Sequence, residues 1–181
     1  PFPLIREACE TLGIGDVAES LLRSMEKRDH RGDASTATGK RSTPGDPALL
    51  PTLIGELSRV SPGFALSMGA SLGLTGQSIM LRGTNEQRRR WIPGLLRGEL
   101  VGAWGLTEPD SGSDAFSMKT LARPVDGGFS ISGSKTFITN APDADVFVVY
   151  ARVDQGEGDG ARRPLAAFVL ERGMPGLTTS Q

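Results

Sequence analysis

The sequence predicts an α+β protein, in which an N-terminal helical bundle is followed by an incomplete antiparallel β-barrel-like domain. Two observations support this fold class. Up to about residue 100, apolar residues recur three and four positions apart, which is the spacing of one helix face. Beyond that point they alternate with a period of two, in runs rich in Val, Ile, Phe and Thr, which is typical of strands. We therefore expect an α-helical domain at 1–100 and a partial β domain at 101–181.

The composition limits the classes of function. The 181 residues carry a net charge of −1, so electrostatic binding to nucleic acid or to an acidic membrane is not expected. Cys9 and His30 are the only cysteine and histidine, which excludes an internal disulfide framework and argues against a Cys/His zinc site. No apolar run reaches membrane-spanning length, and the first residues show no signal-peptide pattern. These features favour a soluble, cytoplasmic protein with no metal and no membrane partner.

The helical half begins near the N-terminus and is interrupted once. Apolar spacing predicts helices over 3–12 and 16–28, and another over 48–60 with Pro51 in its first turn, where proline is tolerated. The segment 30–47 has almost no apolar residues, which is typical of a long polar loop.

Two more helices complete this half. The first is expected from Pro62 onward, with Phe64 and Met68 beginning its apolar face. The second is expected after Thr84, because Gln87 three residues later completes a capping box.

The second half is predicted to consist of strands. The dipeptide Asp126-Gly127 favours a tight turn between two of them, since both positions tolerate left-handed backbone angles. The expected strands cover 100–106, 117–125, 127–138, 144–153 and 164–172. The segment "GFSISGSKT" partly matches a phosphate-binding loop and an S-x-x-K motif, but its place on a hairpin arm fits neither.

A series of short motifs follows in order along the chain: "GTNEQ", "WIPGLLRGE", "LTEPDSGSD", "MKT", "SGSKTFITN", "ADVFVVYAR" and "MPGLT". In this order and spacing they resemble the acyl-CoA dehydrogenase family, from about Phe64 to Gln181. The resemblance implies a helical domain, then a β-barrel-like domain, then a C-terminal four-helix domain. The chain ends partway through the second of these, so we expect it to be a fragment of a longer protein.

The resemblance also implies FAD as cofactor, held by two segments of the β half. The matching positions are Trp104, Leu106, Thr107, Gly112 and Ser113 in the first segment, and Phe137, Ile138 and Thr139 in the second. Thr139 matches the threonine whose hydroxyl contacts the flavin nitrogen that accepts hydride. Ser113 matches a serine that also contacts the thioester substrate.

The residue types suit this role, because a flavin has a polar edge and a flat apolar edge. Trp104 and Phe137 offer flat surfaces, while Thr107, Ser113 and Thr139 offer hydroxyls. Each is also compatible with an ordinary core or strand position.

Three neighbouring polar residues are given other roles. Asn140 is interpreted as a turn residue. Glu108 and Asp114 are interpreted as acceptors of backbone hydrogen bonds that fix a loop, in preference to an acid–base pair.

Two departures from the family pattern are visible. The family most often has tryptophan where Phe137 stands, so an N–H donor is lost there. The usual glycine-rich "P-x-x-x-G-G" stretch is also missing, and the polar segment 29–47 takes its place.

The implied activity is α,β-desaturation of an acyl-CoA or acyl-carrier thioester, with hydride transfer to FAD. The implied partners are an electron-transfer flavoprotein and further copies of the chain, as a dimer or tetramer. The catalytic glutamate is expected in the missing C-terminal domain, so no catalytic residue is nominated here. The alternatives are a non-catalytic subunit that completes a partner's flavin site, and an oxidase or a flavin monooxygenase of the same fold.

Overall fold

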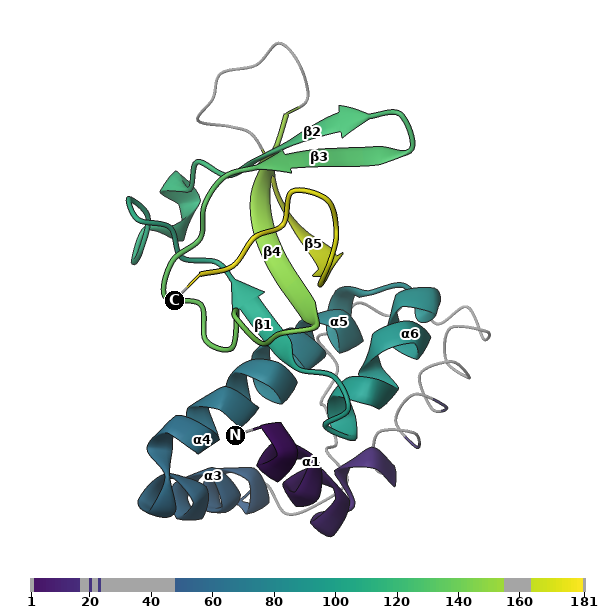
Figure 1. The fold of residues 1–181 in the computed structure, drawn as a ribbon, viewed down its shortest axis with the longest axis vertical. Helices are drawn as coiled ribbons and strands as arrows, with labels where there is room; N and C mark the ends of the chain where they lie inside the picture. Colours follow the sequence, from purple (N-terminus) through teal and green to yellow (C-terminus); the bar gives the residue numbers. More distant parts are fainter. Residues whose placement is uncertain (1, 17–19, 21–22, 24–47, 155–163, 181) are drawn as a thin grey trace. The chain divides into compact units, whose positions relative to one another are not determined.

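The structure is a computed structural model that describes residues 2–16, 20, 23, 48–154 and 164–180. These residues form two compact units, Pro1–Leu100 and Val101–Gln181 (Figure 1). The expected helix over 16–28 and the expected loop over 30–47 lie almost entirely outside the described residues. The α+β class is confirmed: the first unit is helical, and the second contains an open sheet.

The helical unit begins with α1 (Phe2–Thr11), which agrees with the helix expected over 3–12. Its buried face carries Ile5 and Cys9, which are 2% and 1% exposed and form a core cluster with Met68. Gly13 follows the helix with a φ of 62°, a left-handed conformation that commonly ends helices. The observed limits of α1 therefore agree with the apolar spacing to within one residue.

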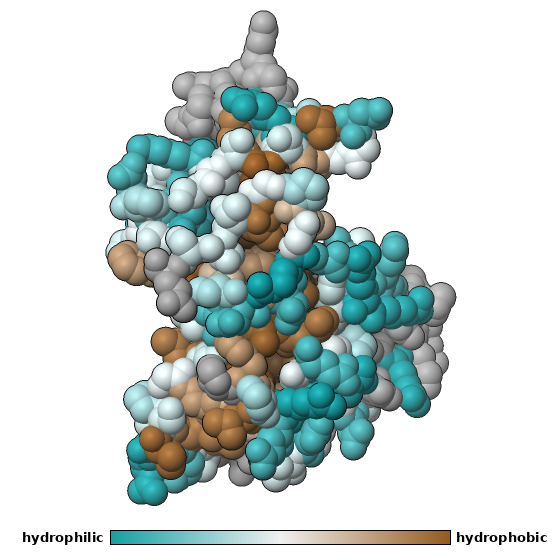
Figure 2. All heavy atoms as spheres, in the orientation of Figure 1, coloured by the Kyte–Doolittle hydropathy of each residue, from teal (hydrophilic) through white to brown (hydrophobic). Residues whose placement is uncertain are grey.

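Helix α3 (Leu49–Val60) follows the undescribed segment, with Pro51 in its first turn as expected. Ser61 separates it from the next helix, and its hydroxyl accepts a hydrogen bond from the backbone N–H of Phe64. This cap satisfies one of the four N–H groups that a helix start leaves unpaired. Figure 2 shows apolar surface over the α3 and α4 region, where Val60 and Leu66 are 86% and 63% exposed.

A continuous helical stretch runs from residue 62 to residue 82. It consists of α4 (Pro62–Met68), the π-helical segment η1 (Gly69–Gly76) and α5 (Gln77–Arg82). Within the described part of the chain, this helix is long and apolar enough to cross a membrane, with a mean hydropathy of 1.2. The expectation that no segment has that length is therefore wrong. The criterion is also met by core helices of soluble proteins, so the absence of a membrane partner stays a prediction.

Helix α6 (Asn85–Leu96) closes the helical unit. The predicted capping box is confirmed: the Thr84 hydroxyl accepts from the backbone N–H of Gln87 at 3.2 Å, and the Gln87 side chain accepts from the N–H of Thr84 at 2.8 Å. Ile92 and Leu95 are fully buried and fix the inner face of the helix.

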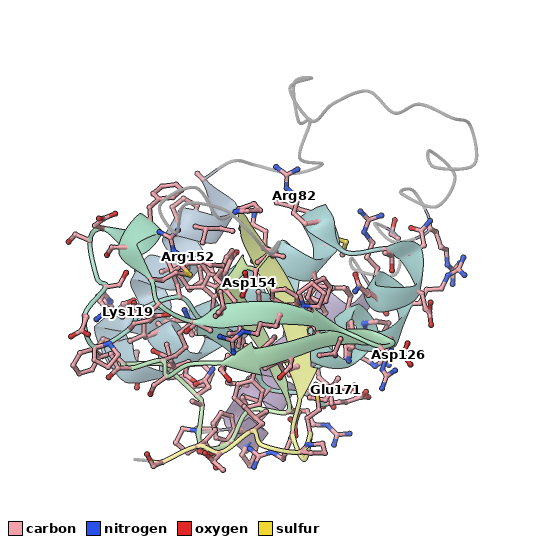
Figure 3. All side chains as sticks on the ribbon, turned by 90° about the horizontal axis from the view of Figure 1, so that it is seen from above. Arg82, Lys119, Asp126, Arg152, Asp154 and Glu171 are labelled. Carbon is pink, nitrogen blue, oxygen red and sulfur yellow. The ribbon has the colours of Figure 1, made fainter. Side chains whose placement is uncertain are left out.

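The second unit contains a five-stranded sheet: β1 (Gly102–Gly105), β2 (Leu121–Val125), β3 (Gly128–Ser132), β4 (Val146–Val153) and β5 (Leu165–Glu171). The expected turn at Asp126-Gly127 is present, with Gly127 at a φ of 76°, and β2 pairs antiparallel with β3. Asp126 lies at the tip of this hairpin (Figure 3). The hairpin is local, and sequence alone was enough to find it.

The sheet as a whole is mixed, which corrects the expectation of a purely antiparallel domain. The strand β4 lies at its centre and pairs parallel with β1 and with the first residues of β2. It pairs antiparallel with β5 on its other side. The parallel pairs arise because long loops, and not hairpins, connect β1 to β2 and β3 to β4. These two loops contain all of the predicted FAD-binding residues except Trp104, which lies on β1.

Candidate functional site

The loop 106–120, between β1 and β2, is organised around the carboxylate of Glu108. This side chain is 5% exposed and accepts hydrogen bonds from the backbone N–H groups of Lys119 at 2.6 Å and Thr120 at 3.0 Å. The hydroxyl of Thr120 also donates to it. The interpretation of Glu108 as a brace for the loop is confirmed.

Glu108 also forms a buried ion pair with Lys135. The Lys135 ammonium lies 2.8 Å from the Glu108 Oε1 atom, donates to the carbonyl of Leu106 at 3.0 Å and contacts the Met118 sulfur at 3.8 Å. Burial raises the pKa of Glu108, but hydrogen bonds from Lys135, Thr120 and two backbone N–H groups outweigh this and lower it to about 2. Glu108 is therefore ionised at neutral pH and fully engaged, which does not suit a general base. Lys135 is likewise engaged, which rules out the S-x-x-K interpretation.

Asp114 and Arg152 hold the outer part of the same loop. The Asp114 carboxylate accepts from the N–H of Phe116 at 3.2 Å, and its carbonyl accepts from the hydroxyls of Ser111 and Ser117. Arg152, labelled in Figure 3, extends from β4 and donates to the carbonyl of Met118 at 2.8 Å. It also donates to the carbonyl of Phe116. Asp114 is thus a structural residue of the loop, as expected.

The second loop lies between β3 and β4 and includes Phe137, Ile138 and Thr139. These residues were expected on a strand through 138, but β3 ends at Ser132. Phe137 has a φ of 55° and Asn140 a φ of 69°, and such left-handed angles are incompatible with a strand. Asn140 is a turn residue, as interpreted, and its side chain donates to the carbonyl of Gly102 at 3.0 Å.

One backbone hydrogen bond joins the two loops: the N–H of Thr136 donates to the carbonyl of Thr107 at 3.0 Å. It brings Thr107 next to the segment that contains Phe137, Ile138 and Thr139. Thr107 and Thr139 are half-buried. Within the described residues, neither hydroxyl takes part in a hydrogen bond.

The other predicted positions are spread along the first segment. Trp104 lies on β1, and its ring meets Tyr150 edge-on with the centroids 5.4 Å apart. Its indole N–H is buried and has no hydrogen-bond partner within the described part of the chain. Leu106 is half-buried, whereas Gly112 and Ser113 are exposed.

Gly112 does not have a left-handed φ, and a Cβ atom built there would meet nothing within 4 Å. The loop itself therefore does not require glycine at this position. Open space around its backbone leaves room for a ligand to approach.

The exposed side chains of this region have the chemistry that a flavin requires. Phe137 is 94% exposed, a large apolar surface held in water on a strained backbone. The hydroxyls of Thr107, Ser113 and Thr139 form no hydrogen bond with any other described residue. A flat apolar ring beside unpaired donors fits a heteroaromatic ligand with one polar edge.

Sequence reasoning missed the ion pair between Glu108 and Lys135. A signal was present, because an acid that directly follows the apolar run 103–106 lies close to the core and needs a cation or several donors. The same reasoning would have directed attention to Lys135, the one lysine of the second loop. Arg152 has no comparable signal, since its partners are backbone carbonyls.

Two family models match the chain, one for each of its two units. A model described as "Acyl-CoA dehydrogenase, middle domain" matches residues 103–181. A model described as "Acyl-CoA dehydrogenase, N-terminal domain" matches residues 46–99. The chain therefore belongs to the acyl-CoA dehydrogenase family, and it contains that family's N-terminal and middle domains.

Individual relatives agree with this assignment. Mitochondrial isovaleryl-CoA dehydrogenase of Oryza sativa subsp. japonica is 43% identical over 126 residues, which are 70% of this chain and 30% of the relative. A glutaryl-CoA dehydrogenase from Mycobacterium smegmatis, solved in complex with FADH2, is 34% identical, with a TM-score of 0.63 over 69% of this chain and 30% of that one. Butyryl-CoA dehydrogenase from Megasphaera elsdenii is 29% identical, with a TM-score of 0.67 over 95% of this chain and 49% of that one. The chain thus spans less than half the length of each.

Proposed function

We propose that this protein works as an FAD-dependent acyl-CoA dehydrogenase, which desaturates an acyl thioester between its α and β carbons. Family membership supports the reaction class. FAD as cofactor is supported by the glutaryl-CoA dehydrogenase from Mycobacterium smegmatis, a relative that was solved with FADH2 bound.

The observation that carries the proposal is the pairing of the two loops. The hydrogen bond from Thr136 to Thr107 places two unpaired threonine hydroxyls and an exposed phenylalanine on adjacent backbone segments. A phenylalanine in the left-handed region costs roughly 1–3 kcal/mol of backbone strain. Strain of this kind, combined with almost complete exposure, is typical of a residue that a ligand contacts.

In this proposal, FAD is held by the eight positions that the sequence indicated. Thr107 and Thr139 donate hydrogen bonds to its polar atoms, and Phe137 packs its ring against the flat system. The backbone N–H groups of Gly112 and Ser113, which donate to no backbone carbonyl of the described residues, are additional donors, and Ser113 also contacts the thioester. When bound, FAD supplies the acceptor for the hydride that leaves the β carbon.

The proton acceptor for the α carbon is not assigned to the described β unit. Glu108 is ionised and surrounded by donors, and Asp114 holds the N–H of Phe116. A proton acceptor must reach the substrate, and both carboxylates are already engaged within the loop. We therefore assign the base to neither of these carboxylates.

The remaining partners follow from the same proposal. An electron-transfer flavoprotein would reoxidise the flavin, and the protein would act as a dimer or tetramer. We propose a cytoplasmic location, although the rice relative is named as mitochondrial. Both acyl-CoA and acyl-carrier thioesters are compatible with an exposed Ser113.

The test is flavin content followed by anaerobic reduction. The intact protein is reconstituted with FAD, separated from free cofactor, and titrated with short and branched acyl-CoA thioesters without oxygen. Bleaching of the flavin absorbance supports the proposal, and slow reoxidation in air separates a dehydrogenase from an oxidase. A protein that retains no FAD, but binds a larger flavoprotein, would instead be a non-catalytic subunit.

A further inference from the structure

Lys135 joins three separate stretches of the β unit. Its ammonium contacts the carbonyl of Leu106, the carboxylate of Glu108 and the sulfur of Met118. The side chain is 11% exposed, so these contacts are largely shielded from water. One cation therefore fixes both ends of loop 106–120 to the loop that contains Lys135.

The position of Lys135 in the chain matters as much as its contacts. It precedes Phe137 by two residues and Thr139 by four, and its partner Glu108 directly follows Thr107. The backbone hydrogen bond from Thr136 to Thr107 lies beside the ion pair. Any shift of the ammonium would therefore be passed on to the proposed cofactor contacts.

Close packing next to the ion pair reinforces this connection. A Cβ atom at Gly133 would lie 2.7 Å from the Cα atom of Thr120, so the two backbones approach more closely than any other residue would allow. Thr120 donates its N–H and its hydroxyl to Glu108. The start of β2 thus meets both loops at one point.

Stability alone does not explain the arrangement. A buried ion pair loses much of its attraction to desolvation, and apolar residues of similar volume often serve stability as well. An apolar pair would not hold the carbonyl of Leu106 and the carboxylate of Glu108 at fixed distances from the loop that contains Lys135. The contacts of Lys135 specify geometry in a way that packing does not.

We propose that Lys135 is a positioning residue for cofactor binding, which sets Phe137 and Thr139 against Thr107. This inference rests on the proposed function, because it assumes that FAD is the ligand of these residues. It adds a role for a residue that touches neither cofactor nor substrate.

The test compares K135M with the double variant E108Q/K135M in the intact protein. K135M leaves a buried carboxylate unpaired and is expected to lose stability and to raise the Kd for FAD at least tenfold. E108Q/K135M removes both charges and is expected to recover stability, while its Kd stays raised. Hydrogen exchange at the Thr136 N–H is expected to be faster in both variants, with or without FAD. The control K119M removes the exposed pair with Asp110 and should change none of these quantities.

The outcomes are distinct. A double variant that regains FAD affinity together with stability would show that Lys135 matters only for folding, and would overturn the inference. Unchanged exchange at Thr136 would overturn it as well. If K135M does not fold, the Kd for FAD and the exchange rate at Thr136 in E108Q/K135M decide between the two interpretations. Wild-type protein that binds no FAD would refute the proposed function, and the inference with it, before any variant is compared.

Discussion

The carbonyl of Thr107 accepts a hydrogen bond from the backbone N–H of Thr136 at 3.0 Å, across 29 residues that include a complete hairpin. This bond belongs to no strand ladder. It joins the two loops beside the buried ion pair of Glu108 and Lys135.

The Thr139 hydroxyl is expected to contribute to cofactor affinity. Changing Thr139 to Val removes one donor with little change in volume, so FAD should bind about fivefold more weakly, or about 1 kcal/mol. Flavin fluorescence titration measures this, with the exposed Thr178→Val as control. Equal affinities for T139V and T178V would contradict the role.

Phe137 is expected to reduce the stability of the cofactor-free protein. F137G relieves roughly 1–3 kcal/mol of left-handed strain, and the added freedom of the unfolded chain offsets roughly 0.5–1 kcal/mol of this gain. The free energy of unfolding should therefore rise by about 1 kcal/mol, while FAD affinity falls roughly tenfold because the ring is lost. Urea unfolding and FAD titration measure the two effects.

Phe116 provides the matched control for this substitution. It is 76% exposed and has no left-handed φ, so F116G should slightly lower stability and leave FAD affinity unchanged. A loss of stability in F137G equal to that in F116G would mean that the strain is not released.

Stability is expected to depend on pH through Glu108. Its folded pKa of about 2 lies below the ordinary value of 4.5, so its contribution is present above pH 4.5 and is lost as the pH falls toward 2. The difference amounts to roughly 3 kcal/mol. Urea unfolding of wild type and E108Q between pH 6 and pH 2 should show the two curves converging in acid. Parallel curves over this range would indicate a folded pKa close to the ordinary one.

The capping box of α6 supplies a prediction in the helical unit. Replacing Thr84 by Ala removes the acceptor for the Gln87 N–H and should lower the free energy of unfolding by about 1 kcal/mol. The change Thr52→Ala at the fourth residue of α3 is the control, since it removes no cap and alanine is the better helix former. Helix signal in circular dichroism during urea unfolding measures both, and a T84A curve that overlaps the wild type would contradict the cap's contribution.

Local signals in the sequence were reliable because they depend on a few neighbouring residues. Three such signals determine the backbone conformation at their own positions: the capping box at Thr84, the turn at Asp126-Gly127 and the proline at the start of α4. The direction of β4 relative to β1 has no such local signal. Alternation of apolar residues shows that a strand has two faces, but not which neighbour it pairs with. The mixed sheet therefore had to come from the structure.

The candidate site was predicted in part. The resemblance indicated Thr107, Phe137 and Thr139, and the structure places them on adjoining segments. It did not indicate that Phe137 lies in a loop, because "KTFIT" has the composition of a strand and left-handed angles are rare for phenylalanine. The role of Lys135 was also missed, since its partner Glu108 is 27 residues away.

The parallel pairing of β1 with β4 has a consequence for how this unit forms. The N–H of Val101 donates to the carboxylate of Asp145, 44 residues later, and β1 gains its ladder only when β4 arrives. Contacts of such separation make folding slow, because a long chain must close before any of them forms. The contacts that Arg152 of β4 makes with loop 106–120 therefore form only after that strand has been synthesised.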